Sequence, residues 1–178
     1  LPAVPFPVDP FPLLLWYGQA IKEEHSRNRW DKNLEKIAKD YASNCIWGHN
    51  LYRGFAGENL FARAENPSFM EAIKSWYSEI QHFSPAMMTC DSDETCGHYT
   101  QVVWANSRKV GCAIHKCPTM KKLPTFKDAT FIVCNYLPPG NYIGTKPYKK
   151  GAVCSQCPTG YKCKDKLCSE SFFIFLNQ

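Results

Sequence analysis

Two stretches of the chain have the apolar spacing of amphipathic helices. In the first, over about residues 32–44, the apolar positions recur at i, i+3, i+4, i+7 and i+8, and they are Leu34, Ile37, Ala38, Tyr41 and Ala42. Asp31 precedes this stretch and can cap it. In the second, from Phe69 to His82, Ser68 and Glu71 have the spacing of a capping box. We expect both helices to bury their apolar faces.

Three later stretches, residues 98–104, 110–116 and 129–136, have the composition of β-strands. The first is rich in Tyr, Thr, Val and Trp, which are strand formers. Since side chains alternate along a strand, His98 would share one face with Thr100, Val102 and Trp104. Helices that precede such strands indicate a domain with mixed α and β structure.

Two connecting segments are predicted to be loops. Residues 46–61 contain Gly48, Gly54 and Gly57, and glycine lets the backbone turn or approach a site closely. Residues 118–128 are basic and join the second and third predicted strands.

The two ends of the chain differ in composition from the middle. Residues 1–29 begin with prolines at 2, 5, 7, 10 and 12, so we expect an extended segment with a helical turn or two after residue 14. The same prolines argue against a signal peptide, and the sequence is interpreted as a mature chain. A Gly-Asn turn at 140 and 141 closes a central domain of residues 30–145, and residues 146–178 form a small cysteine-rich appendage.

Composition indicates the compartment and excludes some partners. The 178 residues include ten cysteines, an even number typical of an oxidised, secreted protein. The net charge of +5 is concentrated late in the chain, where lysines form a solvated face or, alternatively, meet an anionic glycan or membrane surface. No nucleic-acid-binding motif accompanies them. No apolar run approaches the roughly 18 residues of a transmembrane helix.

Two long motifs resemble those of a known family. Residues 97–107, GHYTQVVWANS, and residues 131–142, FIVCNYLPPGNY, are similar to the signature motifs of the CAP superfamily of cysteine-rich secretory, antigen-five and pathogenesis-related proteins. WDKNLEKIAKDYASNCIWGHN, GENLF and IKSWYSEI also match, so the resemblance covers roughly residues 30–168. It implies an α+β fold, a three-layer α/β/α sandwich with a small disulfide-stapled hinge. Residues 1–29 depart from the family pattern.

The resemblance also implies how the cysteines pair. In the domain it implies Cys45 with Cys117 and Cys112 with Cys134, which leaves Cys90 with Cys96. In the hinge it implies Cys154 with Cys163 and Cys157 with Cys168. By spacing alone, the four hinge cysteines could instead ligate zinc.

Four polar residues are the candidate site. By resemblance, the cleft tetrad of the family maps onto His49, Glu58, Glu79 and His98. Neutral imidazoles suit zinc or another divalent metal, with the carboxylates as further ligands or as supports of the histidines. Such a site should release its metal in acid, because imidazole must be neutral to bind. In the structural alternative, the four residues bond one another and bind nothing.

The sequence leaves several functions open. The favoured one is a secreted, non-enzymatic binding module whose cleft recognises a protein, lipid or sterol partner. The alternatives are a protease inhibitor and a zinc-dependent peptidase with His49 and His98 as ligands and Glu58 or Glu79 as general base. The chain contains no HExxH motif, and no substrate-like inhibitory loop is evident. Nothing in the sequence indicates an oligomeric state.

Overall fold

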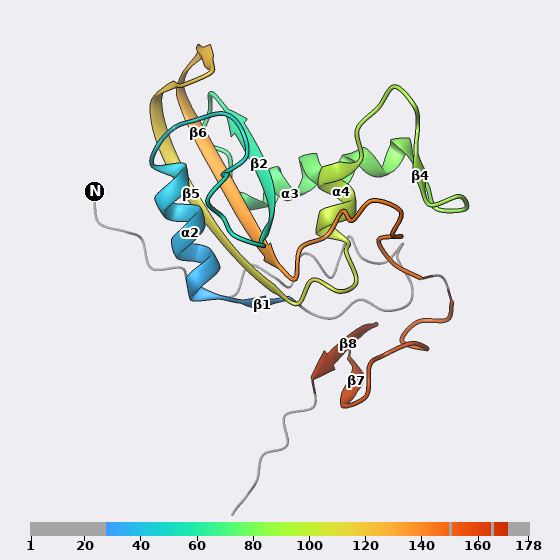
Figure 1. Cartoon of the computed structure of the whole chain (residues 1–178). Helices are drawn as coiled ribbons and strands as arrows, with labels where there is room; N and C mark the ends of the chain where they lie inside the picture. The colour runs from blue at the N-terminus through green and yellow to red at the C-terminus, as the bar shows by residue number, and fades with distance from the viewer. Residues whose placement is uncertain (1–27, 150, 165, 171–178) are drawn as a thin grey trace, which may run out of the picture.

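The computed structural model describes residues 28–149, 151–164 and 166–170 (Figure 1). Its centre is a four-stranded sheet in the order β1-β5-β6-β2, formed by Arg29–Trp30, Lys109–Met120, Leu123–Leu137 and Gly57–Arg63. β1 is parallel to β5, and the other neighbours are antiparallel. Helix α2, Lys32–Ala42, covers one face of the sheet, and α3, Phe69–Ser78, and α4, Gly97–Val102, lie on the other (Figure 1). The three-layer α/β/α sandwich is therefore confirmed.

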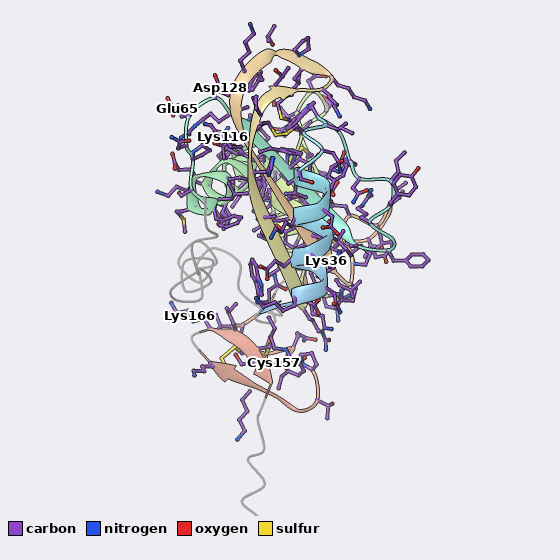
Figure 2. All side chains as sticks on the ribbon, turned by 90° about the vertical axis from the view of Figure 1, so that its left-hand side faces the viewer. Lys36, Glu65, Lys116, Asp128, Cys157 and Lys166 are labelled. Atoms are coloured by element: carbon purple, nitrogen blue, oxygen red, sulfur yellow. A yellow bond between two sulfur atoms is a disulfide. The ribbon has the colours of Figure 1, made fainter. Side chains whose placement is uncertain are left out.

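Helix α2, Lys32–Ala42, forms the first layer and agrees with the predicted helix. Asp31 caps it by accepting hydrogen bonds from the backbone N–H groups of Asn33 and Leu34, at 3.0 and 3.1 Å. Ala38 and Ala42 are fully buried in a core that includes Leu60, Phe131 and Val133. Figure 2 shows α2 along the face of the sheet, between the hairpin end near Asp128 and the hinge with Cys157 and Lys166.

The second helical layer contains α3, Phe69–Ser78, the short 3-10 helix η3, Glu79–His82, and α4, Gly97–Val102. The predicted helix from Phe69 to His82 thus consists of α3 and η3. Trp76 of α3 is buried against Ile132 and Cys134 of β6. Because residues alternate along β6, Phe131 and Val133 face α2 while Ile132 and Cys134 face α3, and residues 129–136 are all buried.

The strand predicted over residues 98–104 is wrong, because residues 97–102 form α4. The carboxylate of Glu79 accepts hydrogen bonds from the backbone N–H groups of His98 and Tyr99, at 2.9 and 3.1 Å. These N–H groups have no partner within the first turn of a helix. The Glu79 carboxylate, which is distant in the sequence, therefore stabilises α4 as a helix although the residues of α4 favour a β-strand.

Both predicted loops contain strand. Residues 57–61, the end of the predicted loop at 46–61, belong to β2, Gly57–Arg63, which pairs with β6 over its whole length. Residues 118–128 continue the β5–β6 hairpin, in which Thr119 pairs with Lys127 and Met120 with Leu123. This part of the hairpin is largely exposed on both faces, so its sequence has little alternation of apolar and polar residues.

Disulfides connect the elements in the pattern that the resemblance implied. The pairs are Cys45–Cys117, Cys90–Cys96, Cys112–Cys134, Cys154–Cys163 and Cys157–Cys168. Two short hairpins complete the fold: β3, Phe83–Ser84, with β4, Thr89–Cys90, and, in the hinge, β7, Tyr161–Lys164, with β8, Leu167–Glu170. The helical turn expected after residue 14 lies outside the described residues. No helix in the described part of the chain is long and apolar enough to cross a membrane.

Candidate functional site

The first pair of site residues, Glu79 and His98, joins η3 to α4. Glu79 directly follows α3, and its Oε1 lies 2.6 Å from Nδ1 of His98. Its Oε2 accepts the two backbone hydrogen bonds that cap α4, since the side chain of Cys96 at the N-cap makes none. The ring of His98 also stacks on Trp76, with ring centroids 6.4 Å apart and planes 11° apart. His98 is therefore held by the backbone, by a carboxylate and by an aromatic ring.

The second pair joins the loop before β2 to β2 itself. Oε1 of Glu58 lies 2.8 Å from Nδ1 of His49 and accepts a second hydrogen bond, at 2.9 Å, from the backbone N–H of Asn50. The Glu58 side chain is fully buried, whereas that of His49 is 56% exposed. The hydroxyl of Tyr41 donates a 2.6 Å hydrogen bond to the carbonyl of Gly48. Helix α2 thereby positions the loop that carries His49.

The two pairs approach β2 from opposite faces of the sheet. Glu58 is the register partner of Asn135, on the face that α2 covers. The next residue, Asn59, points to the other face and donates a 3.0 Å hydrogen bond from Nδ2 to the carbonyl of His98. Since β2 is at the edge of the sheet, a single strand separates the two pairs. The structure thus brings all four predicted residues to one strand.

In the described part of the chain, Glu58 and its neighbour Asn135 have buried polar atoms without hydrogen-bond partners. Oε2 of Glu58 has no hydrogen-bond partner within the described residues, and neither do Oδ1 and Nδ2 of Asn135, which is fully buried. Buried polar atoms of this kind are commonly bridged by ordered water. Asn135 therefore belongs to the surroundings of the site.

The hydrogen bonds decide which histidine nitrogens can bind a metal. An ionised carboxylate only accepts, so Nδ1 of His49 and Nδ1 of His98 each carry the proton that they donate. Nε2 of each neutral ring then keeps its lone pair. Metal-binding histidines in proteins have this arrangement, with the far ring nitrogen bonded to a carboxylate.

The four residues do not form a cage of four ligands. No three of them, as described here, bring ligand atoms within 4.8 Å of one another. With each carboxylate bonded to an Nδ1 atom, the ligand atoms that the four residues offer to a metal are the Nε2 atoms of the two imidazoles.

Two other clusters of ligand-type side chains lack the chemistry for zinc. One contains Cys45, His115 and Cys117, and the other contains Cys154, Cys157 and Cys168. Every sulfur in them belongs to a disulfide, and zinc requires a thiolate. The zinc site considered for the hinge cysteines is therefore excluded.

Sequence reasoning missed three residues that position the site. Trp76 has the position of an apolar core residue in its helix, but its indole donates a 2.9 Å hydrogen bond to the carbonyl of Leu60 and stacks on His98. Asn59 and Asn135 lie within the motifs GENLF and FIVCNYLPPGNY, and this position was the one indication in the sequence that they could belong to the site. Their contacts depend on strand pairing that no local pattern encodes.

Comparison with known proteins assigns the family. The sequence profile of CAP, the cysteine-rich secretory protein family, matches residues 26–136. The chain belongs to the CAP family. Human peptidase inhibitor 16 is 46% identical over 141 residues, which are 79% of this chain and 30% of that protein. Human peptidase inhibitor 15 is 42% identical over 154 residues. This match covers 78% of this chain and 59% of peptidase inhibitor 15.

Solved CAP-like structures agree with this fold. Na-ASP-1 has a TM-score of 0.68 and 28% sequence identity, with 83% of this chain and 39% of that one covered. NaASP2, solved with Zn²⁺, has a TM-score of 0.65 and 27% sequence identity. The match covers 82% of this chain and 77% of NaASP2. The CAP chain described here thus shares its architecture with both.

Proposed function

We propose that this CAP domain is a secreted binding module in which His49 and His98 hold one divalent metal ion, zinc by preference, beside a surface that recognises a protein partner. The observation that carries the proposal is the pairing of each Nδ1 with a glutamate carboxylate. This pairing orients both rings and leaves their Nε2 atoms as ligands. The zinc-containing structure of the relative NaASP2 supports the choice of metal.

The carboxylates favour binding over peptide hydrolysis. A general base must come within hydrogen-bond reach of the water that it activates. Glu58 is fully buried and bonds His49 and the backbone of Asn50. Glu79 already accepts bonds from the ring and backbone of His98 and from the backbone of Tyr99. Oε1 of Glu58 and both oxygens of Glu79 are thus bonded to the histidines and the adjacent backbone, and the remaining Oε2 of Glu58 is buried.

Disulfides and relatives support an extracellular role with a protein partner. The structure contains no free cysteine in its described part, as expected for an oxidising compartment. The family is described as secretory. The names of the relatives peptidase inhibitor 16 and peptidase inhibitor 15 make a peptidase one candidate partner.

Zinc titration calorimetry at neutral pH tests the metal site. We expect micromolar binding by the unmodified protein and none by a folded His49→Ala/His98→Ala variant. His115→Gln is the matched control, because His115 lies in the other histidine-containing cluster. Binding that survives the double substitution, or that His115→Gln removes, would contradict the assignment.

A peptide-cleavage assay separates the binding module from the peptidase. We expect no turnover of a fluorogenic peptide mixture in the presence of zinc. Cleavage that a chelator abolishes and that Glu58→Gln or Glu79→Gln removes would show that the domain is an enzyme.

A further inference from the structure

The loop at residues 50–56, between His49 and Glu58, is ordered by its own polar groups. Arg53 donates from Nε to the carbonyl of Ala56 at 2.9 Å and from Nη1 to the carbonyl of Asn50 at 2.6 Å. Oδ1 of Asn50 accepts a 2.9 Å hydrogen bond from the backbone N–H of Tyr52. These polar groups therefore form hydrogen bonds within the loop.

The same loop presents large apolar side chains to solvent. Leu51 is 86% exposed, Tyr52 is 94% exposed and Phe55 is 92% exposed. Single exposed apolar residues are ordinary, but several on one ordered loop are typical of an interaction site. These three side chains add nothing to the core of the domain. Their grouping therefore indicates a role outside folding.

A cavity of about 570 Å³ adjoins this loop. Helix α2 contributes Ile37 and Tyr41, and the segment after it contributes Ile46. Leu51 and Tyr52 form another part of the lining, and Lys122 of the β5–β6 turn lies at the cavity as well. The volume is in the range of sites that enclose a small ligand or a few side chains.

The cavity lining contains a lysine that has no carboxylate partner in the described part of the chain. Lys122 is exposed, and it forms no ion pair with a carboxylate among the residues that the structure describes. Asp40, which also lines the cavity, is already paired with Lys36 at 2.6 Å. The uncompensated charge of Lys122 favours an acidic partner.

We propose that loop 50–56 and this cavity form a docking surface for a segment of an extracellular protein in which a large apolar side chain neighbours acidic residues. The apolar side chain enters the cavity against Ile37 and Tyr41, and an acidic group meets Lys122. The cavity favours a protein segment over a membrane, because a protein segment can insert one side chain into the cavity and a bilayer surface cannot. The inference names the partner class and so rests on the proposed binding function, but it does not require metal.

Selection from a displayed library of random short peptides, carried out in chelator with the whole chain, tests this surface. We expect the enriched peptides to combine Leu or an aromatic residue with Asp or Glu. Enrichment should fall at least about tenfold, the equivalent of roughly 1.4 kcal/mol, on a Leu51→Ser/Tyr52→Ser/Phe55→Ser variant. The exposure of these side chains makes loss of the fold unexpected, and thermal unfolding of the variant checks this.

Two further variants sharpen the test. Tyr142→Ser/Ile143→Ser removes another exposed apolar pair, 56% and 104% exposed, and should leave enrichment unchanged. Lys122→Glu should abolish the preference for acidic residues. Equal enrichment on the triple variant, or no apolar and acidic signature, would overturn the proposal.

Two more outcomes distinguish the docking surface from a membrane contact and from the metal site. Phosphatidylserine vesicles that bind through the same three apolar residues, in the absence of peptide enrichment, would show that the surface meets a membrane and would overturn the proposal. Because chelator is present, a failed selection beside successful zinc titration refutes the docking surface alone. The reverse result refutes the metal site alone.

Discussion

The carboxylate of Glu79 accepts hydrogen bonds from both the ring of His98 and the first turn of α4. One residue therefore determines where the helix begins and which nitrogen of the histidine stays available. Glu58 has the corresponding role for His49, through the ring and the backbone of Asn50. At the residue scale, the site is a pair of histidines oriented by buried or half-buried carboxylates.

Replacing a supporting carboxylate should weaken metal binding without removing a ligand. We predict that Glu79→Gln lowers zinc affinity by about 10–100-fold, because the neutral amide no longer favours the Nδ1–H tautomer of His98. Calorimetry measures the loss. Glu65→Gln, at a largely exposed glutamate, is the control and should change nothing. Unchanged affinity in Glu79→Gln would mean that the carboxylate does not support the metal.

Gly111 is required where α2 crosses β5. A Cβ atom at this position would overlap the backbone of Glu35 and Leu34, which cannot move without displacing the helix. We predict that Gly111→Ala costs about 1–3 kcal/mol of unfolding free energy, measured by urea titration. Gly97→Ala is the comparison, since its Cβ would meet only Asn141 at 3.8 Å. Similar stabilities of the two variants would contradict close packing of α2 on β5.

At the element scale, the start of α3 depends on a charged capping box. Ser68 and Glu71 bond each other's backbone, and Arg63 of β2 pairs with the Glu71 carboxylate. Hydrogen bonds from the backbone of Ser68 and from Arg63 lower the pKa of Glu71 from 4.5 to about 2. The helix is thereby joined to the sheet by an acceptor that stays ionised in mild acid.

This pKa shift predicts a pH dependence of stability. Because the folded-state pKa is depressed, Glu71 stabilises the fold fully above about pH 4.5, and the contribution disappears as pH falls through about 2. Glu71→Gln should therefore be less stable than the unmodified protein at neutral pH and should approach it near pH 2. Urea titrations over this range measure the difference. A difference that does not change with pH would contradict the ionised cap.

Local sequence patterns predicted the elements whose determinants are local. The apolar spacing and the caps at Asp31 and Ser68 were sufficient for α2 and α3. Residues 97–102 were misassigned because Glu79, about twenty positions earlier, determines their conformation. Family motifs supplied the four candidate residues, but which carboxylate bonds which histidine depends on the fold around β2.

At the scale of the whole molecule, disulfides hold together parts that differ in how much core they have. Cys45–Cys117 joins the end of α2 to β5 across a sequence separation of 72 residues. In the described part of the hinge the regular structure is the short β7–β8 hairpin, and two disulfides close the hinge over separations of 9 and 11. Small units with little core depend on such bonds.

Opening one hinge disulfide should therefore affect the hinge alone. We predict that Cys157→Ser/Cys168→Ser removes roughly 2–3 kcal/mol from the hinge and makes residues 151–170 sensitive to protease. Zinc affinity and the unfolding midpoint of the sandwich should stay unchanged. Limited proteolysis with mass spectrometry maps the cuts. Cleavage within the sheet instead would show that the hinge stabilises the whole chain.

The most direct test of the central claim is a crystal structure with zinc, with the ion located from its anomalous scattering. We predict one site at which Nε2 of His49 and Nε2 of His98 lie about 2.0–2.1 Å from the metal, while Glu58 and Glu79 remain bonded to the Nδ1 atoms. Zinc bound at His115 or through Nδ1, or no zinc at this cleft, would contradict the account.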